Sequence, residues 1–145
     1  MAKINQKVKL IINLAKTHSI FVKRFEGGLG NGLGLNEFLI LFHLNQSIDK
    51  KMRRIDLAEK IGVTASGITR MLLPMEKIGL VKSDYFSVDA RVKFVSISKS
   101  GEEKIKETLE RFSDLIEEIL FSIKDSEIKK VSDLLLEIGG KILIA

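Results

Sequence analysis

The chain has 145 residues, of which 45% are hydrophobic and 30% charged, a balance that is typical of a folded globular protein and excludes a disordered one. It contains no cysteine, which excludes disulfides, thiolate metal ligands and thiol-based redox sensing. The net charge of +5 is unevenly distributed: residues 50–100 carry 11 basic and 5 acidic side chains, whereas residues 101–145 carry 7 and 11. A basic block inside a globular chain favours a polyanionic partner.

The hydropathy of the chain and its first residues predict the cellular location of the protein. No apolar run approaches the roughly 20 residues that a membrane helix requires. The basic segment 1–13 shows no signal-peptide cleavage pattern. We therefore expect a soluble, cytoplasmic protein without a membrane partner.

The first third of the chain predicts two helices separated by a glycine-rich loop. Residues 3–25 have apolar side chains at helical spacing, and a mostly buried helix capped by Asn36 is predicted over 35–46. Segment 27–34 contains too many glycines to continue a helix. It is not a phosphate-binding loop either, because it has neither a G-x-G-x-x-G register nor a following GK[ST].

The remaining elements are two short helices, a strand pair and two further helices. The helices are predicted over about 53–61 and 64–78, and the strands over 80–83 and 91–98. Ser98 or Ser100 opens a long amphipathic helix that starts at Gly101 and ends near Ile123, and Ser100 and Glu103 have capping-box spacing. A last helix is predicted over 126–138, with a break at Gly139-Gly140.

The segment 54–71 predicts a helix-turn-helix. Two helices that cross at a steep angle need a small residue at the contact, a residue that tolerates positive φ at the turn, and an apolar anchor on the second helix. Ala58, Gly62 and Ile68 meet these needs in order. The alternative is an ordinary helical hairpin with a solvated face.

The outer face of the second helix carries short hydroxyls and an arginine. Ser66, Gly67, Thr69 and Arg70 lie on that face, and Thr64 precedes it. Such groups suit phosphate and base-edge contacts in a major groove, and the positive end of the helix dipole favours phosphate. We therefore predict DNA contacts from this face.

A β-hairpin directly after a helix-turn-helix is typical of a winged helix. Arg91 lies near the predicted hairpin tip, where it could enter a minor groove, and Asp89 could orient its guanidinium. The alternative is a solvated turn with an exposed ion pair. Lys93 shares strand parity with the core-facing Val95, so it contacts DNA only if the wing overhangs the core.

Residues 35–120 resemble the MarR family of winged-helix regulators. The resemblance rests on an ordered series of motifs: LAEKI at 57–61, SGITR at 66–70, MEKIGLV at 75–81, DAR at 89–91 and SISKSG at 96–101. It implies a single MarR-like domain over 1–145, in which residues 35–100 form the DNA-binding lobe. It also implies dimerisation through residues 3–26 and 101–143, whose apolar stripes need a partner to bury them.

The resemblance assigns the recognition helix to 64–77 and the wing pair to Asp89 and Arg91. Arg53 stands where family members often carry a capping threonine or serine, so this end of the third helix can instead touch phosphate. The predicted DNA-binding residues are Arg53, Arg54, Thr64, Ser66, Gly67, Thr69, Arg70, Asp89, Arg91 and Lys93.

We expect a mainly α winged helix-turn-helix protein with about six helices and a β-hairpin wing. Its expected function is transcriptional regulation as a homodimer on double-stranded DNA with a pseudo-palindromic operator, as a ligand-responsive repressor. A small aromatic ligand is implied by the resemblance alone, and we expect no cofactor and no metal. The alternative is a winged-helix protein-interaction module that does not bind DNA. We do not expect an enzyme, because His18 and His43 have no catalytic or metal partners at suitable spacing.

Overall fold

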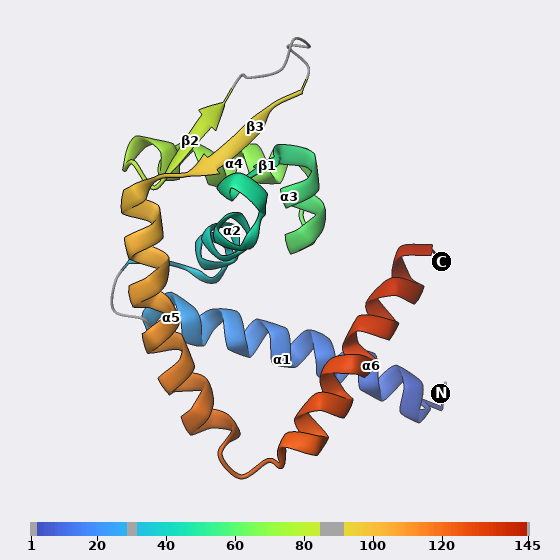
Figure 1. Ribbon diagram of the computed structural model, residues 1–145. Helices are drawn as coiled ribbons and strands as arrows, with labels where there is room; N and C mark the ends of the chain where they lie inside the picture. The colour runs from blue at the N-terminus through green and yellow to red at the C-terminus, as the bar shows by residue number, and fades with distance from the viewer. Residues whose placement is uncertain (1–2, 29–31, 85–91, 145) are drawn as a thin grey trace. The chain divides into compact units, whose positions relative to one another are not determined.

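The computed structural model describes residues 3–28, 32–84 and 92–144, and it divides into two compact units, Met1–Glu110 and Arg111–Ala145. The fold is mainly α-helical, as the sequence predicts (Figure 1). In chain order the elements are α1 (Gln6–Gly28), α2 (Leu35–Gln46), the 3-10 helix η1 (Ile48–Lys50), β1 (Lys51–Arg53), α3 (Arg54–Ile61), α4 (Ala65–Lys77), β2 (Val81–Asp84), β3 (Phe94–Ile97), α5 (Lys99–Leu120) and α6 (Asp125–Ile144).

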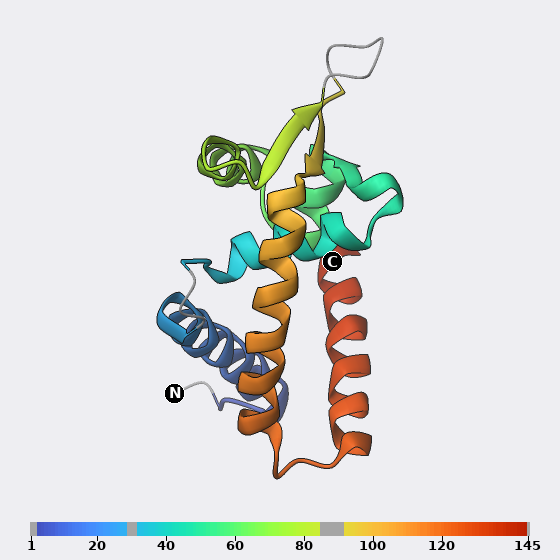
Figure 2. The same ribbon diagram turned by 60° about the vertical axis from the view of Figure 1, so that its left-hand side comes forward.

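Three short strands form one antiparallel sheet in the order β1-β3-β2. β2 pairs with β3 so that Val81 faces Ile97, and β1 pairs with the other edge of β3 so that Met52 faces Val95. The arrows of β2 and β3 run side by side in Figure 1 and Figure 2. The predicted strand pair is therefore confirmed. β1 was not predicted, because three residues are too few to show an alternating pattern.

The helix-turn-helix between α3 and α4 follows the predicted chemistry. Gly62 has φ 76° and ψ 33°, the left-handed conformation that a glycine adopts without a Cβ clash. The amide of Val63 donates to the carbonyl of Ala58 across the turn (2.9 Å). Ala58 and the anchor Ile68 are both buried. The turn therefore sets the direction in which α4 leaves α3.

The core of the lobe lies between α2, α3, α4 and the sheet. α2 contributes four buried apolar side chains, as its predicted burial requires. α4 runs without interruption past Pro74 and turns one apolar face inward, which leaves its opposite face exposed. The buried side chains of this core are Phe38, Ile40, Leu41, Leu44, Leu57, Ile68, Leu72, Met75, Val81 and Val95.

Of the predicted helix caps, the one for α2 is wrong, and one of the two serines predicted to open α5 is confirmed. α2 begins after Gly34, which makes no side-chain cap, so the predicted Asn36 cap is wrong. α5 begins at Lys99, because the buried Ser98 hydroxyl accepts from the amide of Gly101 (3.0 Å). The same hydroxyl donates to the carbonyl of Gly79 (2.5 Å). Ser98 therefore opens α5, rather than Ser100.

The predicted break at Gly139-Gly140 is also wrong, since α6 continues through both glycines to Ile144. A glycine inside a helix costs only about 1 kcal/mol relative to alanine. Lys141 pairs with Glu137 one turn earlier (3.2 Å), across the two glycines. The α6 helix thus continues for six residues beyond its predicted end at 138.

Candidate nucleic-acid interface

Helix α4, the predicted recognition helix, begins at a well-formed cap. The hydroxyl oxygen of Thr64 accepts a hydrogen bond from the amide of Gly67 (3.0 Å), and it lies 3.2 Å from the Ser66 hydroxyl. A Cβ at position 67 would approach the Thr64 hydroxyl oxygen to 3.0 Å, so glycine leaves room for the cap. Two residues predicted to bind DNA, Thr64 and Gly67, therefore also fix the start of the helix.

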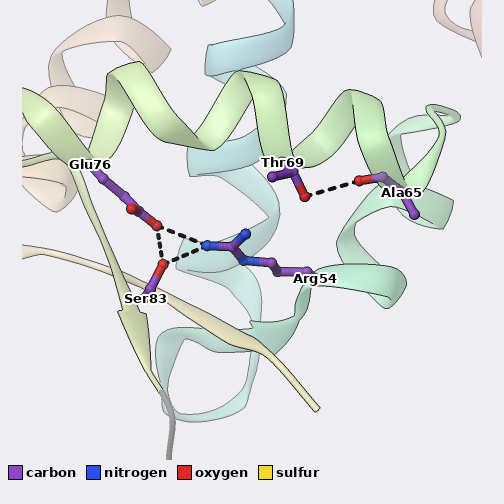
Figure 3. A network of polar contacts seen from close by, with 5 residues as sticks. All are labelled: Arg54, Ala65, Thr69, Glu76 and Ser83. Atoms are coloured by element: carbon purple, nitrogen blue, oxygen red, sulfur yellow. Dashed lines mark hydrogen bonds and ion pairs between the residues drawn. The ribbon is translucent and has the colours of Figure 1, made fainter. Parts of the chain in front are cut away.

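The outer face of α4 is open in the single chain. Ser66, Thr69 and Arg70 are all exposed, and none of them packs into the core. The Thr69 hydroxyl donates to the carbonyl of Ala65 (3.1 Å), which leaves its oxygen able to accept (Figure 3). This face presents two hydroxyls and a guanidinium at the positive end of a helix dipole.

Arg53 stands at the junction of β1 and α3 and is exposed. Its Nε and Nη2 donate to the two carboxylate oxygens of Asp56, at 2.8 and 3.0 Å. These hydrogen bonds, and the charge of Asp56, raise the pKa of the Arg53 guanidinium above its usual value. The Asp56 carboxylate thus holds the charged guanidinium of Arg53 at the surface, next to the start of α4.

Arg54, the next residue, points the other way and is half-buried. Its Nη2 donates to Glu76 Oε1 on α4 (3.1 Å) and to the Ser83 hydroxyl on β2 (2.6 Å), and Ser83 also contacts Glu76 (Figure 3). Only 15% of the Arg54 side chain is exposed. Its predicted role in DNA contact stays a prediction, whereas its side-chain contacts in the structure are with α4 and β2.

Lys93 lies just before β3 and is exposed, although it shares parity with the buried Val95. Its carbonyl accepts from the amide of Arg54 (2.9 Å), which ties the base of the wing to the start of α3. The predicted wing pair, Asp89 and Arg91, lies outside the described residues.

Several of the predicted residues surround one hollow of about 330 Å³. It lies where the end of β1, the start of α3, α4 and the segment before β3 meet. The cationic side chains come from β1, α3 and the segment before β3, the hydroxyl group comes from α4, and apolar groups come from α3, α4 and the segment before β3. Its lining residues are Arg53, Arg54, Ile55, Ala65, Ile68, Thr69, Val92 and Lys93.

The apolar part of this hollow was not predicted from the sequence. Ile55 is 60% exposed, an unusual setting for a large aliphatic side chain at the start of a helix. Ile55 lies outside the apolar stripe of α3, which is formed by Leu57, Ala58 and Ile61. An apolar residue outside that stripe was the signal in the sequence that could have predicted its exposure. Exposed apolar groups beside a DNA-reading helix can contact thymine methyl groups.

The fold and these positions define a winged-helix protein, and comparison with known proteins places it more closely. The sequence profile of the MarR family matches residues 33–93. The crystal structure of the transcriptional regulator BldR from Sulfolobus solfataricus is 30% identical, with 99% of this chain and 98% of BldR covered and a TM-score of 0.79. The chain belongs to the MarR family.

Two more distant relatives cover most of the chain. The uncharacterized HTH-type transcriptional regulator YdgJ of Bacillus subtilis (strain 168) is 21% identical over 138 residues, which are 95% of this chain and 82% of YdgJ. The MarR family regulator Sco3205 from Streptomyces coelicolor, solved in complex with DNA, is 18% identical, with 97% and 91% covered and a TM-score of 0.83. At this identity Sco3205 establishes the shared fold.

Within 3–28, 32–84 and 92–144, no three histidine, aspartate or glutamate side chains cluster to hold a metal ion. None of the helices described has the length and apolarity needed to cross a membrane.

Proposed function

We propose that this protein is a sequence-specific DNA-binding regulator of transcription. The observation that carries the proposal is the exposed outer face of α4, where Ser66, Thr69 and Arg70 stand at the helix start beside a hollow rimmed by Arg53 and Lys93. A helix of this width fits a major groove, and these side chains match the donors and acceptors of bases and phosphates. The DNA complex of the structurally similar Sco3205 supports the proposal.

The proposed working form is a homodimer. α1 exposes a series of aliphatic side chains in the single chain, and α6 exposes another. Aliphatic faces of this length are stable in water when a partner covers them. In a twofold dimer the two α4 helices would read half-sites about 34 Å apart, so the operator would be pseudo-palindromic. The exposed aliphatic residues are Ile4 just before α1, Val8, Leu10, Ile11, Ile12 and Ile20 on α1, and Val131, Leu134, Leu135, Leu136, Ile142 and Leu143 on α6.

We propose that the protein represses transcription, because a dimer bound to a palindrome that overlaps a promoter excludes polymerase. We propose the cytoplasm as its location, because the chromosomal DNA that it would bind lies there. A small ligand that alters the DNA-binding state is part of the same proposal. A hollow of about 480 Å³ between the end of α1 and the start of α2, lined by His18 and by the carboxylates of Glu26 and Glu37, is a place for it to bind. These carboxylates favour a neutral or cationic ligand over an anionic one.

The experiment is a titration of the protein against duplex DNA from its own upstream region at several salt concentrations. Binding through several phosphate contacts predicts a steep, linear fall of log affinity with log salt concentration. A salt-independent interaction, or none with any duplex, would favour the alternative of a winged-helix protein-interaction module. That the chain is not an enzyme stays a prediction.

A further inference from the structure

We propose that Arg54 is a positioning residue, which fixes the direction of the wing relative to the recognition helix α4. The proposal deepens the proposed function and rests on it, since the direction of the wing bears on affinity only in a DNA complex. It replaces the direct DNA contact that the sequence predicts for this arginine.

The backbone and the side chain of Arg54 bind different parts of the lobe. Its amide donates to the carbonyl of Lys93, in the segment of the wing that leads into β3 (2.9 Å). Its guanidinium donates to Ser83 on the outgoing strand β2 (2.6 Å) and to Glu76 near the end of α4 (3.1 Å). Figure 3 shows the two side-chain contacts. One residue at the start of α3 therefore holds both legs of the wing and α4 together.

The side chains of Arg54 and Glu76 are largely buried, which strengthens the contact between them. The side chains of Arg54 and Glu76 are 15% and 26% exposed, so solvent screens their attraction weakly. Ser83 completes a three-membered network, because it contacts both charged partners. Nε of Arg54 is buried without a hydrogen-bond partner in the part of the chain described, which makes burial of the guanidinium costly. The two hydrogen bonds at Nη2 offset this cost.

The contrast with Arg53 supports the assignment. Arg53 holds its guanidinium at the surface with Asp56, and 51% of its side chain is exposed. The two consecutive arginines thus have different surroundings. Arg53 faces the side from which DNA would approach, and Arg54 faces the junction of α4 and β2.

The substitution Glu76→Gln distinguishes a positioning role of Arg54 from a direct contact of Arg54 with DNA. If Arg54 touched phosphate, Glu76→Gln would release a guanidinium and remove a negative charge, and both changes would strengthen DNA binding. If Arg54 positions the wing, the same substitution weakens binding despite the favourable change in charge. We expect a loss of about tenfold, the scale of one charged hydrogen bond. Ser83→Ala, which leaves the charge unchanged, should also weaken binding, and Ser83→Thr should restore it.

The matched control is Glu59→Gln, which removes an exposed acid from the same lobe and should leave DNA affinity unchanged or slightly raised. Urea unfolding of each variant confirms that it is folded at the assay temperature. Hydroxyl-radical footprints should lose protection in the flanking minor grooves, where the wings are proposed to lie, while the central protection and the ranking of preferred bases are retained. A merely structural defect would weaken both regions together.

A second readout needs no DNA. In the free protein, hydrogen exchange at the amides of Arg54 and Ser83 should accelerate about tenfold in Glu76→Gln and Ser83→Ala, while exchange in the α2 core at Leu41 and Leu44 is unchanged. Tighter DNA binding by Glu76→Gln, or wild-type footprints with unchanged exchange, would overturn the proposal. If wild-type protein binds no duplex, the proposed function fails, and the exchange measurement still decides whether Arg54 holds the wing.

Discussion

Gly101, in the first turn of α5, lies directly against the backbone carbonyl of Leu80, which precedes β2. A Cβ built on Gly101 would stand 2.7 Å from Cγ1 of Ile97 and closer still to the Leu80 oxygen. That oxygen also accepts from the amide of Ser98 (3.0 Å). The start of α5 is therefore fixed to the point where the recognition helix passes into the wing.

We expect Gly101→Ala to destabilise the protein by about 2 kcal/mol or more, because the contact is with backbone and cannot relax by a side-chain rotation. Urea unfolding followed by circular dichroism measures the change. Ser100→Ala, at the exposed neighbouring position, is the control and should change stability by less than about 0.5 kcal/mol. Equal stabilities of the two variants would contradict the close approach.

The turn between α3 and α4 predicts a different response at Gly62. A Cβ there would meet nothing within 4 Å, so a substitution is penalised only by the positive φ of 76°. Gly62→Ala should cost about 1 kcal/mol, and Gly62→Asn clearly less, because asparagine tolerates the left-handed conformation. The order of the two variants in thermal unfolding is the check. If alanine were the better tolerated residue, the turn would not need this conformation.

His43, on α2, predicts a pH dependence of stability. Burial, and secondly the charge of Lys60, lowers the pKa of His43 below its usual 6.5. The unfolded chain therefore takes up a proton first as the pH falls, so the free energy of unfolding should decrease below about pH 6.5 until the folded form is protonated as well. In His43→Gln this decrease should be smaller between pH 7 and 5.5, with His18→Gln as the matched control. The same slope in His43→Gln and wild type would refute the assignment.

The aliphatic face of α1 predicts an effect on assembly. Ile11→Asp should shift the protein from dimer to monomer in sedimentation equilibrium, because a charge would have to be buried in the proposed interface. Gln46→Glu, at an exposed position on α2 outside the proposed interface, introduces the same charge and should leave the dimer intact. A wild-type chain that sediments as a monomer would contradict the proposed assembly.

Local spacing in the sequence predicted most of the fold but not its long-range contacts. Ala58 and Gly62 were sufficient to predict the helix-turn-helix, because the turn depends on residues close together in the chain. The network of Arg54 was not predictable in this way, since Glu76 and Ser83 are 22 and 29 residues away. The same limit applies to β1, which exists through its pairing with β3.

The end of α6 was missed for a different reason. The pair Gly139-Gly140 was read as a helix break from propensity alone, but the helix continues past it with the Lys141–Glu137 pair on its surface. In the candidate site, the outer face of α4 was predicted from its periodicity, whereas the exposed Ile55 beside it was not, because its position depends on where α3 begins against the sheet.

The most direct test of the central claim, that the outer face of α4 reads a major groove, is selection of bound duplexes from a random pool by wild type and Arg70→Ala. Arg70→Ala should lose about 1–3 kcal/mol of binding free energy and relax the preference at one position of each half-site, while Lys77→Ala, on the same helix, should keep the wild-type consensus. An unchanged consensus and affinity in Arg70→Ala would contradict the claim.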